Sequence, residues 1–418
     1  MSRLKSPQPV LRFTQFFGDW NEKSLGEVLS LENGFAFKSE YFSKDKTDHI
    51  VLTPGSVSID GAFQYGKGQY YKSKGRIPQK FIFKAGDIFI TMTDLTPTAQ
   101  TLGLPAIVPN DGVTYLHNQR LGKLVGYQGD YKFLFQLLKT SRYRKHIVST
   151  ASGTTVKHSS PQKVMASVNY FPTHSEQTKI GDFFQNVDQQ IKLHQEKHNK
   201  LQQLKQAMLG KMFPKFGAKV PQVRFDGFSG NWVSKTLGID VATVIGGGTP
   251  NTMDNRYWNG DIDWYSPTEI GFSPFAYSSV KKITRLGLKN SSAKILPKDK
   301  TILFTSRAGI GDMAILKNEA TTNQGFQSLV LNEGYDTYFI YSMGHLIKDY
   351  ALQNASGSTF LEISGKTLGK MKVKIPSLTE QTKIGQYFQN LDNLIALQQQ
   401  KINKLKNIKQ ACLGKMFV

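Results

Sequence analysis

The chain has 418 residues, a length that allows two or three domains. Hydrophobic residues make up 39% of it, with 27 Phe and 17 Tyr, and this composition excludes a disordered chain because it supplies material for real cores. The formal net charge of +22 predicts a polyanionic partner, nucleic acid ahead of an anionic membrane surface.

Residues 1–26 form the N-terminal segment of a first predicted domain, 1–172. The start, MSRLKSPQPV, lacks the apolar region of a signal peptide, and no stretch of the chain approaches 18 consecutive apolar residues. Cys412 is the only cysteine, which excludes an internal disulfide and a thiolate zinc site. These features predict a cytoplasmic protein with no bound metal and no membrane partner.

Residues 27–150 are predicted to be a mixed α/β block. Apolar, β-branched runs at 81–83 and 87–91 lie between Gly, Pro and Asn residues and predict strands, and 131–145 predicts a helix. Residues 66–76 mix glycines, aromatics and basic side chains, as expected of a loop lying on DNA, although a solvated surface loop gives the same pattern. The candidate DNA contacts in this loop are Lys67, Tyr70, Tyr71, Lys72, Lys74 and Arg76.

Two further segments close the first domain. Asn118, Gln119 and Arg120 are candidate base readers, since amide and guanidinium groups match base edges, but Asn-Gln pairs also cap loops. In 152–158 (SGTTVKH), Thr154 and Lys157 are candidate phosphate contacts, because small hydroxylated turns permit close backbone approach. The alternative for this turn is a purely structural, domain-closing role.

Residues 173–213 predict a long spacer helix. Pro172 and Pro214 bracket it, Ser175 is the expected N-cap, and the charge of Glu176 suits a helix N-terminus. Apolar residues at three-four spacing predict a coiled-coil seam with a polar centre. For His194 and His198 in the seam, packing or solvation is favoured over metal binding. The predicted seam positions are Ile180, Phe184, Val187, Ile191, His198, Leu201, Leu204 and Met208.

A linker, 214–231, leads to a second mixed α/β domain, 232–376, with a strand at 301–305 and a helix at 335–353. Its DNA contact candidates follow the same reasoning as in the first domain, with the same structural alternatives. Arg307 is added because it can reach DNA or hold its own loop. These candidates are Lys281, Lys282, Arg285, Lys289, Arg307, Asn323, Gln324, Ser358 and Thr359.

Residues 377–418 predict a distal spacer helix that repeats the first. Residues 380–417 match 176–213 at 25 of 38 positions with a constant offset of 204 residues and no gap. Thr379 is the expected N-cap ahead of Glu380. The seam positions are Ile384, Phe388, Leu391, Ile395, Ile402, Leu405, Ile408 and Cys412.

The repeat predicts an α+β fold with a pseudo-two-fold internal repeat. Because the first helix ends and the second begins at the same block, the helices are expected to pack as an antiparallel coiled coil that separates the two domains. About 36 residues at 1.5 Å each span roughly 54 Å. Once the width and tilt of the blocks are allowed for, that length matches two DNA half-sites about one helical turn apart, roughly 34–36 Å.

This organisation resembles the specificity subunits of type I restriction-modification systems. The motifs that carry the resemblance are NGFAFK at 33–38, GTP at 248–250, YWNGDIDW at 257–264, LFTSRAGIG at 303–311, NQGF at 323–326 and the two EQTKIG helix starts. The resemblance covers nearly the whole chain. It implies two target-recognition domains that each read half of a split DNA sequence, and two helices that set the gap between the halves.

The resemblance also implies partners. Two methyltransferase subunits, which bind S-adenosylmethionine and methylate adenine, dock around the helices, and motor-nuclease subunits join for cutting. No cofactor is expected in this chain, and no catalytic residue, because the near matches to nucleotide-binding loops at 61–68 and 364–367 each lack a required residue. The alternatives are a recognition subunit of another DNA-methylation defence system and a self-contained DNA-modifying enzyme with an unrecognised site.

The first block departs from the family pattern at one point. Residues 91–94 read TMTD where the second block has TSRA at 305–308. A role for Arg307 therefore cannot be transferred to the first block.

Overall fold

The computed structural model describes residues 7–96, 98–215, 217–307, 309–357 and 361–418. The chain divides into two compact units. Unit 1 holds the residues up to His194 together with Lys401–Val418, and unit 2 holds Gln195–Gln400. Each unit therefore combines one α/β block with part of both long helices.

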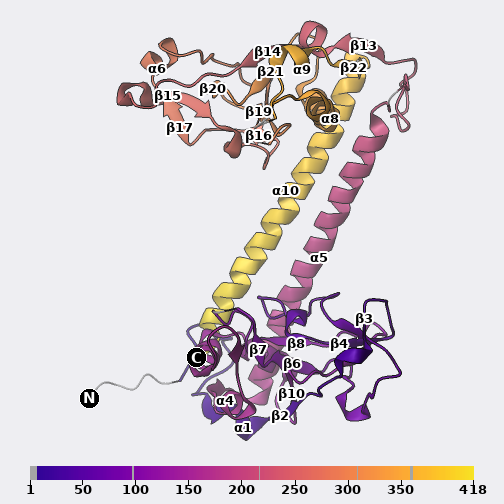
Figure 1. The fold of residues 1–418 in the computed structure, drawn as a ribbon. Coiled ribbons are helices and arrows are strands. Elements are labelled where there is room, and N and C mark those ends of the chain that lie inside the picture. The colour runs from indigo at the N-terminus through magenta and orange to yellow at the C-terminus, as the bar shows by residue number, and fades with distance from the viewer. Residues whose placement is uncertain (1–6, 97, 216, 308, 358–360) are drawn as a thin grey trace. The chain divides into compact units, whose positions relative to one another are not determined.

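The α/β block of unit 1 contains two sheets (Figure 1). The main sheet is antiparallel, and its central strand β6 is buried along its whole length because both faces are covered. A smaller sheet lies beside it, with one parallel pair, β4 and β9. In sheet order the strands are β2 (Ser30–Asn33), β10 (Leu121–Val125), β6 (Ile88–Thr91) and β8 (Pro105–Ile107), then β3 (Phe42–Ser43), β5 (Gln69–Tyr71), β4 (His49–Val51) and β9 (Thr114–Leu116).

Unit 2 repeats this plan with one more strand in its main sheet. β15 and β20 form the parallel pair that corresponds to β4 and β9. In sheet order the strands are β14 (Ala242–Gly246), β21 (Gln327–Leu331), β18 (Thr301–Phe304), β19 (Met313–Leu316) and β16 (Phe275–Ala276), then β17 (Lys281–Ile283), β15 (Trp258–Tyr265) and β20 (Ala320–Thr322).

Short elements complete both units. A two-stranded ribbon precedes each long helix, β1 (Asn21–Ser24) with β12 (Val168–Phe171) and β13 (Val233–Thr236) with β22 (Lys372–Ile375). Unit 1 also has the pair β7 (Thr93–Asp94) and β11 (Lys157–His158). The short helices are α1 (Leu25–Val28), α4 (Pro161–Met165), α6 (Arg285–Lys289) and α9 (Gly365–Gly369).

The helices predicted at 131–145 and 335–353 are each split in two. Unit 1 has α2 (Tyr131–Leu137) and α3 (Ser141–Thr150), because Thr140 accepts a hydrogen bond from Tyr143 N and starts a new helix. Unit 2 has α7 (Thr337–Ser342) and α8 (Gly344–Asn354). None of the described helices is both long and apolar enough to cross a membrane.

The two long helices are α5 (His174–Met212) and α10 (Leu378–Lys415). The predicted N-caps, Ser175 and Thr379, are wrong by two residues. Thr173 and Ser377 accept from the backbone N–H groups of Glu176 and Glu380 instead, each at 3.4 Å.

Within each unit the two long helices pack antiparallel, and the repeat produces the same contact twice. In unit 1, Lys409 Nζ lies 2.6 Å from Asp188 Oδ1, and in unit 2, Lys205 Nζ lies 2.5 Å from Asp392 Oδ1. Both residues of one pair are offset by 204 from those of the other. The two ion pairs therefore fix the same register in both units.

The predicted seam is buried at half of its sixteen positions. The half-buried positions are Ile191, Leu201, Met208, Ile395, Leu405 and Cys412. Leu204 and Ile408 are wrong as seam residues, because 43% and 39% of them are exposed. The buried members are Ile180, Phe184, Val187, His198, Ile384, Phe388, Leu391 and Ile402.

The core of each unit is closed by a phenylalanine at the end of the helix that arrives from the other block. In unit 1, the Phe417 ring stacks on Phe133 with centroids 5.3 Å apart and also meets Trp20 and Phe184. In unit 2, Phe213 makes the equivalent contacts with Phe339, Trp232 and Phe388.

Candidate nucleic-acid interface

Four loops meet at one end of the main sheet of unit 1 and form what we call the loop ledge. Backbone hydrogen bonds join them in sequence. Phe35 N donates to His117 O at 2.8 Å, Met92 N to Arg120 O at 2.9 Å, and Ser159 N to Met92 O at 3.0 Å. The ledge of unit 1 comprises residues 34–37, 91–94, 117–120 and 152–159.

Unit 2 has the same ledge on the same hydrogen-bond frame. Gly248 N donates to Thr322 O at 2.8 Å, Ser306 N to Gly325 O at 2.8 Å, and Ile363 N to Ser306 O at 3.0 Å. The ledge of unit 2 comprises 247–250, 305–307, 323–325, 356–357 and 361–363. In both units the ledge unites candidates that are far apart in the sequence.

In each ledge, a glycine in the first loop lets that loop approach the loop of the Asn-Gln pair closely. A Cβ on Gly34 would lie 2.1 Å from Asn118 O, and one on Gly247 would lie 2.0 Å from Asn323 O. Both distances are far inside van der Waals contact, so neither position accepts a side chain without moving backbone. This match aligns Gly34 with Gly247, Phe35 with Gly248 and Ala36 with Thr249.

The two asparagines of the predicted Asn-Gln pairs cap their own turns. Asn118 Oδ1 accepts from Arg120 N at 2.8 Å, and Asn323 Oδ1 accepts from Gly325 N at 2.8 Å. Loop capping, the alternative to base reading, therefore describes the side-chain oxygens of both asparagines. Gln119, Arg120 and Gln324, by contrast, are exposed.

The ledges differ at the loops that follow β6 and β18. Arg307 is half-buried, and its backbone bridges to Glu362. In unit 1, burial alone would raise the pKa of Asp94, but N–H and O–H groups of Thr96 and Thr101 donate to the carboxylate and hold its pKa below the usual value. Asp94 thus organises its own loop, at the position where the first block departs from the family pattern.

The hairpin from 152 to 158 places Thr154 on the surface. Lys157 is partly committed within the hairpin, since its Nζ donates to Gly153 O at 2.7 Å. The corresponding candidates Ser358 and Thr359 lie outside the described residues.

The basic run of unit 1 flanks strand β5 of the smaller sheet. Lys67, Lys72, Lys74 and Arg76 are exposed and Tyr70 is half-buried. The prediction that Tyr71 contacts DNA is wrong. Its side chain is only 1% exposed and packs against Phe37 and Phe42 in a small core, and this burial raises the pKa of its hydroxyl. It therefore cannot contact DNA from the surface.

The basic run of unit 2 lies on β17 and α6. Lys281, Arg285 and Lys289 are exposed. Lys282 is half-buried, and its Nζ lies 3.0 Å from Asp263 Oδ1. A bound phosphate would have to compete with that carboxylate for Lys282.

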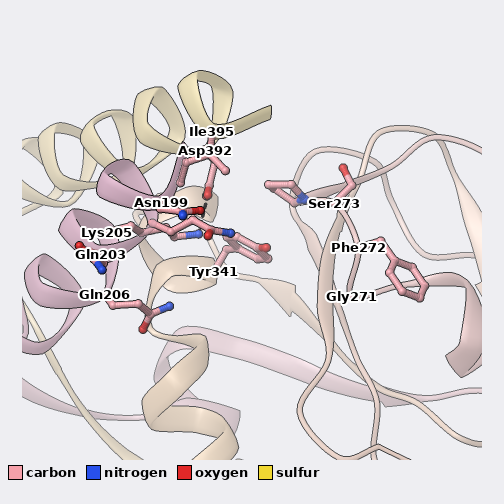
Figure 2. Close-up of a pocket in the computed structure, with 12 residues that line it drawn as sticks. Asn199, Gln203, Lys205, Gln206, Gly271, Phe272, Ser273, Tyr341, Asp392 and Ile395 are labelled. Atoms are coloured by element: carbon pink, nitrogen blue, oxygen red, sulfur yellow. Dashed lines mark hydrogen bonds and ion pairs between the residues drawn. The ribbon is translucent and has the colours of Figure 1, made fainter. Parts of the chain in front are cut away.

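Unit 2 also has a polar groove of about 840 Å³ beside its long helices. Figure 2 shows amide side chains of α5, among them Asn199, Gln203 and Gln206, on one side and the loop with Phe272 on the other. The Lys205–Asp392 ion pair lies at this groove, and Tyr338 donates to Asp392 at 2.8 Å. No cluster of three His, Cys, Asp or Glu within the described ranges is placed to hold a metal.

The sequence did not single out Thr249 as a functional residue. Its hydroxyl donates to Gln324 Oε1 across the ledge of unit 2. The only available signal was its place in the GTP motif at 248–250. Ala36, its counterpart in unit 1, has no hydroxyl.

Comparisons with known proteins agree with this repeated plan. A family model described as the type I restriction modification DNA specificity domain matches residues 18–203 and again 229–407. The MjaIX type I restriction enzyme specificity subunit of Methanocaldococcus jannaschii is 36% identical over 183 residues, 43% of this chain and 42% of that protein. The alignment thus spans less than half of that relative.

Two further comparisons extend over almost the whole chain. The putative MjaX type I restriction enzyme specificity subunit of the same organism is 22% identical over 411 residues, covering 95% of this chain and 92% of the relative. The crystal structure of a type I restriction-modification S subunit from M. genitalium has a TM-score of 0.63 at 16% identity, covering 98% of this chain and 99% of that one. This likeness shows a common fold.

Proposed function

The chain belongs to the type I restriction-modification DNA specificity family, with one family domain in each half, and on this premise we propose that it is the non-catalytic specificity subunit of such a system. It reads a two-part DNA target. The observation that carries the proposal is the pair of loop ledges, which share a backbone frame and present different exposed side chains.

In this proposal each recognition domain, 1–172 and 232–376, reads one half of the target through its ledge. Base contacts come from exposed ledge residues such as Gln119, Arg120 and Gln324, because side chains that read bases must reach the groove edges. The basic runs at 67–76 and 281–289 grip phosphates and position the domain. The helices 173–213 and 377–418 set the gap between the half-sites.

The partners follow from the same proposal. Two methyltransferase subunits, which carry S-adenosylmethionine, dock at the long helices, and the repeat supplies two equivalent surfaces for them. The groove of unit 2 is a candidate contact, since Phe272 at its rim is 89% exposed. Motor-nuclease subunits join in the larger cytoplasmic complex that cuts DNA.

Exchange of one block tests the modular readout. Replacing residues 239–376 with the same block from a family member of different specificity is expected to change one half of the methylated sequence, because the ledge of unit 1 is untouched. Methylation mapping of DNA modified by the assembled complex measures this. A change in both halves, or in neither, contradicts the proposal.

Salt dependence tests the electrostatic part. With a net charge of +22 and several Lys–phosphate contacts, affinity for duplex DNA is expected to fall by orders of magnitude, roughly 10³-fold for six contacts, between 50 and 200 mM salt. Lys72→Ala is expected to reduce the slope of log affinity against log salt by about 1. Fluorescence anisotropy across a salt series gives both slopes. A parent affinity that does not change with salt would contradict the electrostatic binding, and equal slopes in parent and variant would contradict a phosphate contact of Lys72.

A further inference from the structure

The Thr249–Gln324 contact determines which atoms of Gln324 face outward. A free glutamine amide offers both a carbonyl acceptor and an NH₂ donor, and it reads adenine by using both, accepting from N6 and donating to N7. In unit 2 the carbonyl oxygen already accepts from the Thr249 hydroxyl. In this orientation the carbonyl oxygen faces Thr249, and the NH₂ group is left to donate to a ligand.

Both partners of this contact sit on a fixed backbone. Trp264, 5% exposed, donates from Nε1 to Gly248 O at 2.8 Å, directly before Thr249, and Pro250 after it is buried. On the other side, Asn323 N donates to Tyr265 O at 3.0 Å just before Gln324. The hydroxyl and the amide are thus held by the fold on both sides.

Unit 1 provides an internal comparison. Ala36 occupies the position of Thr249, and Gln119 that of Gln324, on the same hydrogen-bond frame. Alanine has no hydroxyl, so Gln119 keeps both amide orientations. The glutamine amide is therefore held in one orientation in the ledge of unit 2, whereas in the ledge of unit 1 no hydroxyl of the neighbouring loop fixes it.

We propose that Thr249 is a specificity-determining residue: it locks Gln324 as a hydrogen-bond donor that meets an acceptor of the DNA in the second half-site. This inference rests on the proposed DNA-reading function. Guanine presents two acceptors, N7 and O6, in the major groove, whereas cytosine presents an amino donor there. Guanine is thus the favoured base and cytosine the excluded one.

A phosphate oxygen is an acceptor too, and the experiment separates it from a base edge. The full chain is used to select duplexes randomised in both half-sites, and Gln324→Ala identifies the base position that depends on Gln324. If the acceptor is a base edge, Gln324→Ala abolishes preference at that one position, and 7-deazaguanine there weakens the parent but not the variant. If it is a phosphate, Gln324→Ala weakens all sequences equally.

Thr249→Ala tests the lock itself. With the carbonyl released, Gln324 gains adenine readout, and the guanine-to-adenine ratio at the dependent position is expected to fall about tenfold, since a good bidentate contact discriminates by this order. Thr249→Ser keeps the hydroxyl and should retain the parental profile. Equal weakening of all sequences in Gln324→Ala would indicate a phosphate contact and would overturn the specificity role of Thr249, because phosphate contacts carry no base information.

The matched variant in unit 1 is Ala36→Thr, which is expected to narrow the preference at the position read by Gln119. The proposal is overturned if Thr249→Ala binds and selects like the parent, or if the Gln324 position of the parent prefers cytosine or adenine. A parent without any base preference would overturn the proposed function itself, and the inference with it. Thermal melting of each variant separates loss of readout from loss of fold.

Discussion

Replacing Phe417 with alanine is expected to destabilise unit 1 by about 3–5 kcal/mol, the usual effect of removing a buried phenyl ring. The side chain is 8% exposed and stacks on Phe133 within the ring cluster that includes Trp20 and Phe184. Because the cluster lies between the α/β block and both helices of unit 1, its loss affects the whole unit.

Hydrogen exchange resolved by peptide measures the effect in each unit separately. Phe213→Ala is the matched variant and should weaken protection in unit 2 instead. Phe272→Ala is the control, since its side chain is 89% exposed and the change should stay within about 0.5 kcal/mol. Unchanged protection of unit 1 in Phe417→Ala would show that the ring does not close that core.

Arg224→Ala is expected to cost about 3–5 kcal/mol in unit 2, because it strands a buried carboxylate. Arg224 Nε and Nη2 both lie 2.7 Å from Glu380, whose side chain is only 1% exposed. Arg12 and Glu176 repeat this two-point contact in unit 1, so Arg12→Ala should have the same effect there.

Chemical denaturation, with the two units followed separately, checks this prediction. Arg256→Ala is the control, since 75% of the Arg256 side chain in its pair with Asp254 is exposed and ion pairs at the surface contribute little. The double variant Arg224→Met, Glu380→Leu should recover most of the loss, because it removes the unpaired charge. If Arg224→Ala unfolds at the same denaturant concentration as the parent, the Glu380 carboxylate is not left unpaired and the prediction is wrong.

The repeat at an offset of 204 residues predicted the two long helices, the connectivity of the chain predicted their antiparallel packing, and apolar, β-branched runs predicted the two mixed blocks. Periodicity carries this information because a helix buries one face at regular spacing. The helix starts were misplaced at Ser175 and Thr379, since any hydroxyl near the first turn satisfies the sequence rule. Only the geometry selects Thr173 and Ser377.

The candidate interface was less predictable, because it depends on contacts between distant segments. The composition around Tyr71 is typical of a DNA-binding loop. Successive side chains of a strand point to opposite faces, however, and in β5 the side chain of Tyr71 points into a core. Nothing local connects Thr249 with Gln324, and sequence spacing cannot show that an asparagine oxygen is used by its own turn. The basic residues were easier to place, because exposure is the default for Lys and Arg.

The position of Phe417 in the core of unit 1 affects the order in which the two units finish folding during synthesis. Arg142 of α3 is hydrogen-bonded to Val418 across 276 residues of chain, so unit 1 is completed only when those residues have left the ribosome. Unit 2, Gln195–Gln400, is synthesised without interruption. Unit 1 is thus translated first but finishes folding last, and a chain that stops a few residues early would contain an incomplete unit 1 and a complete unit 2.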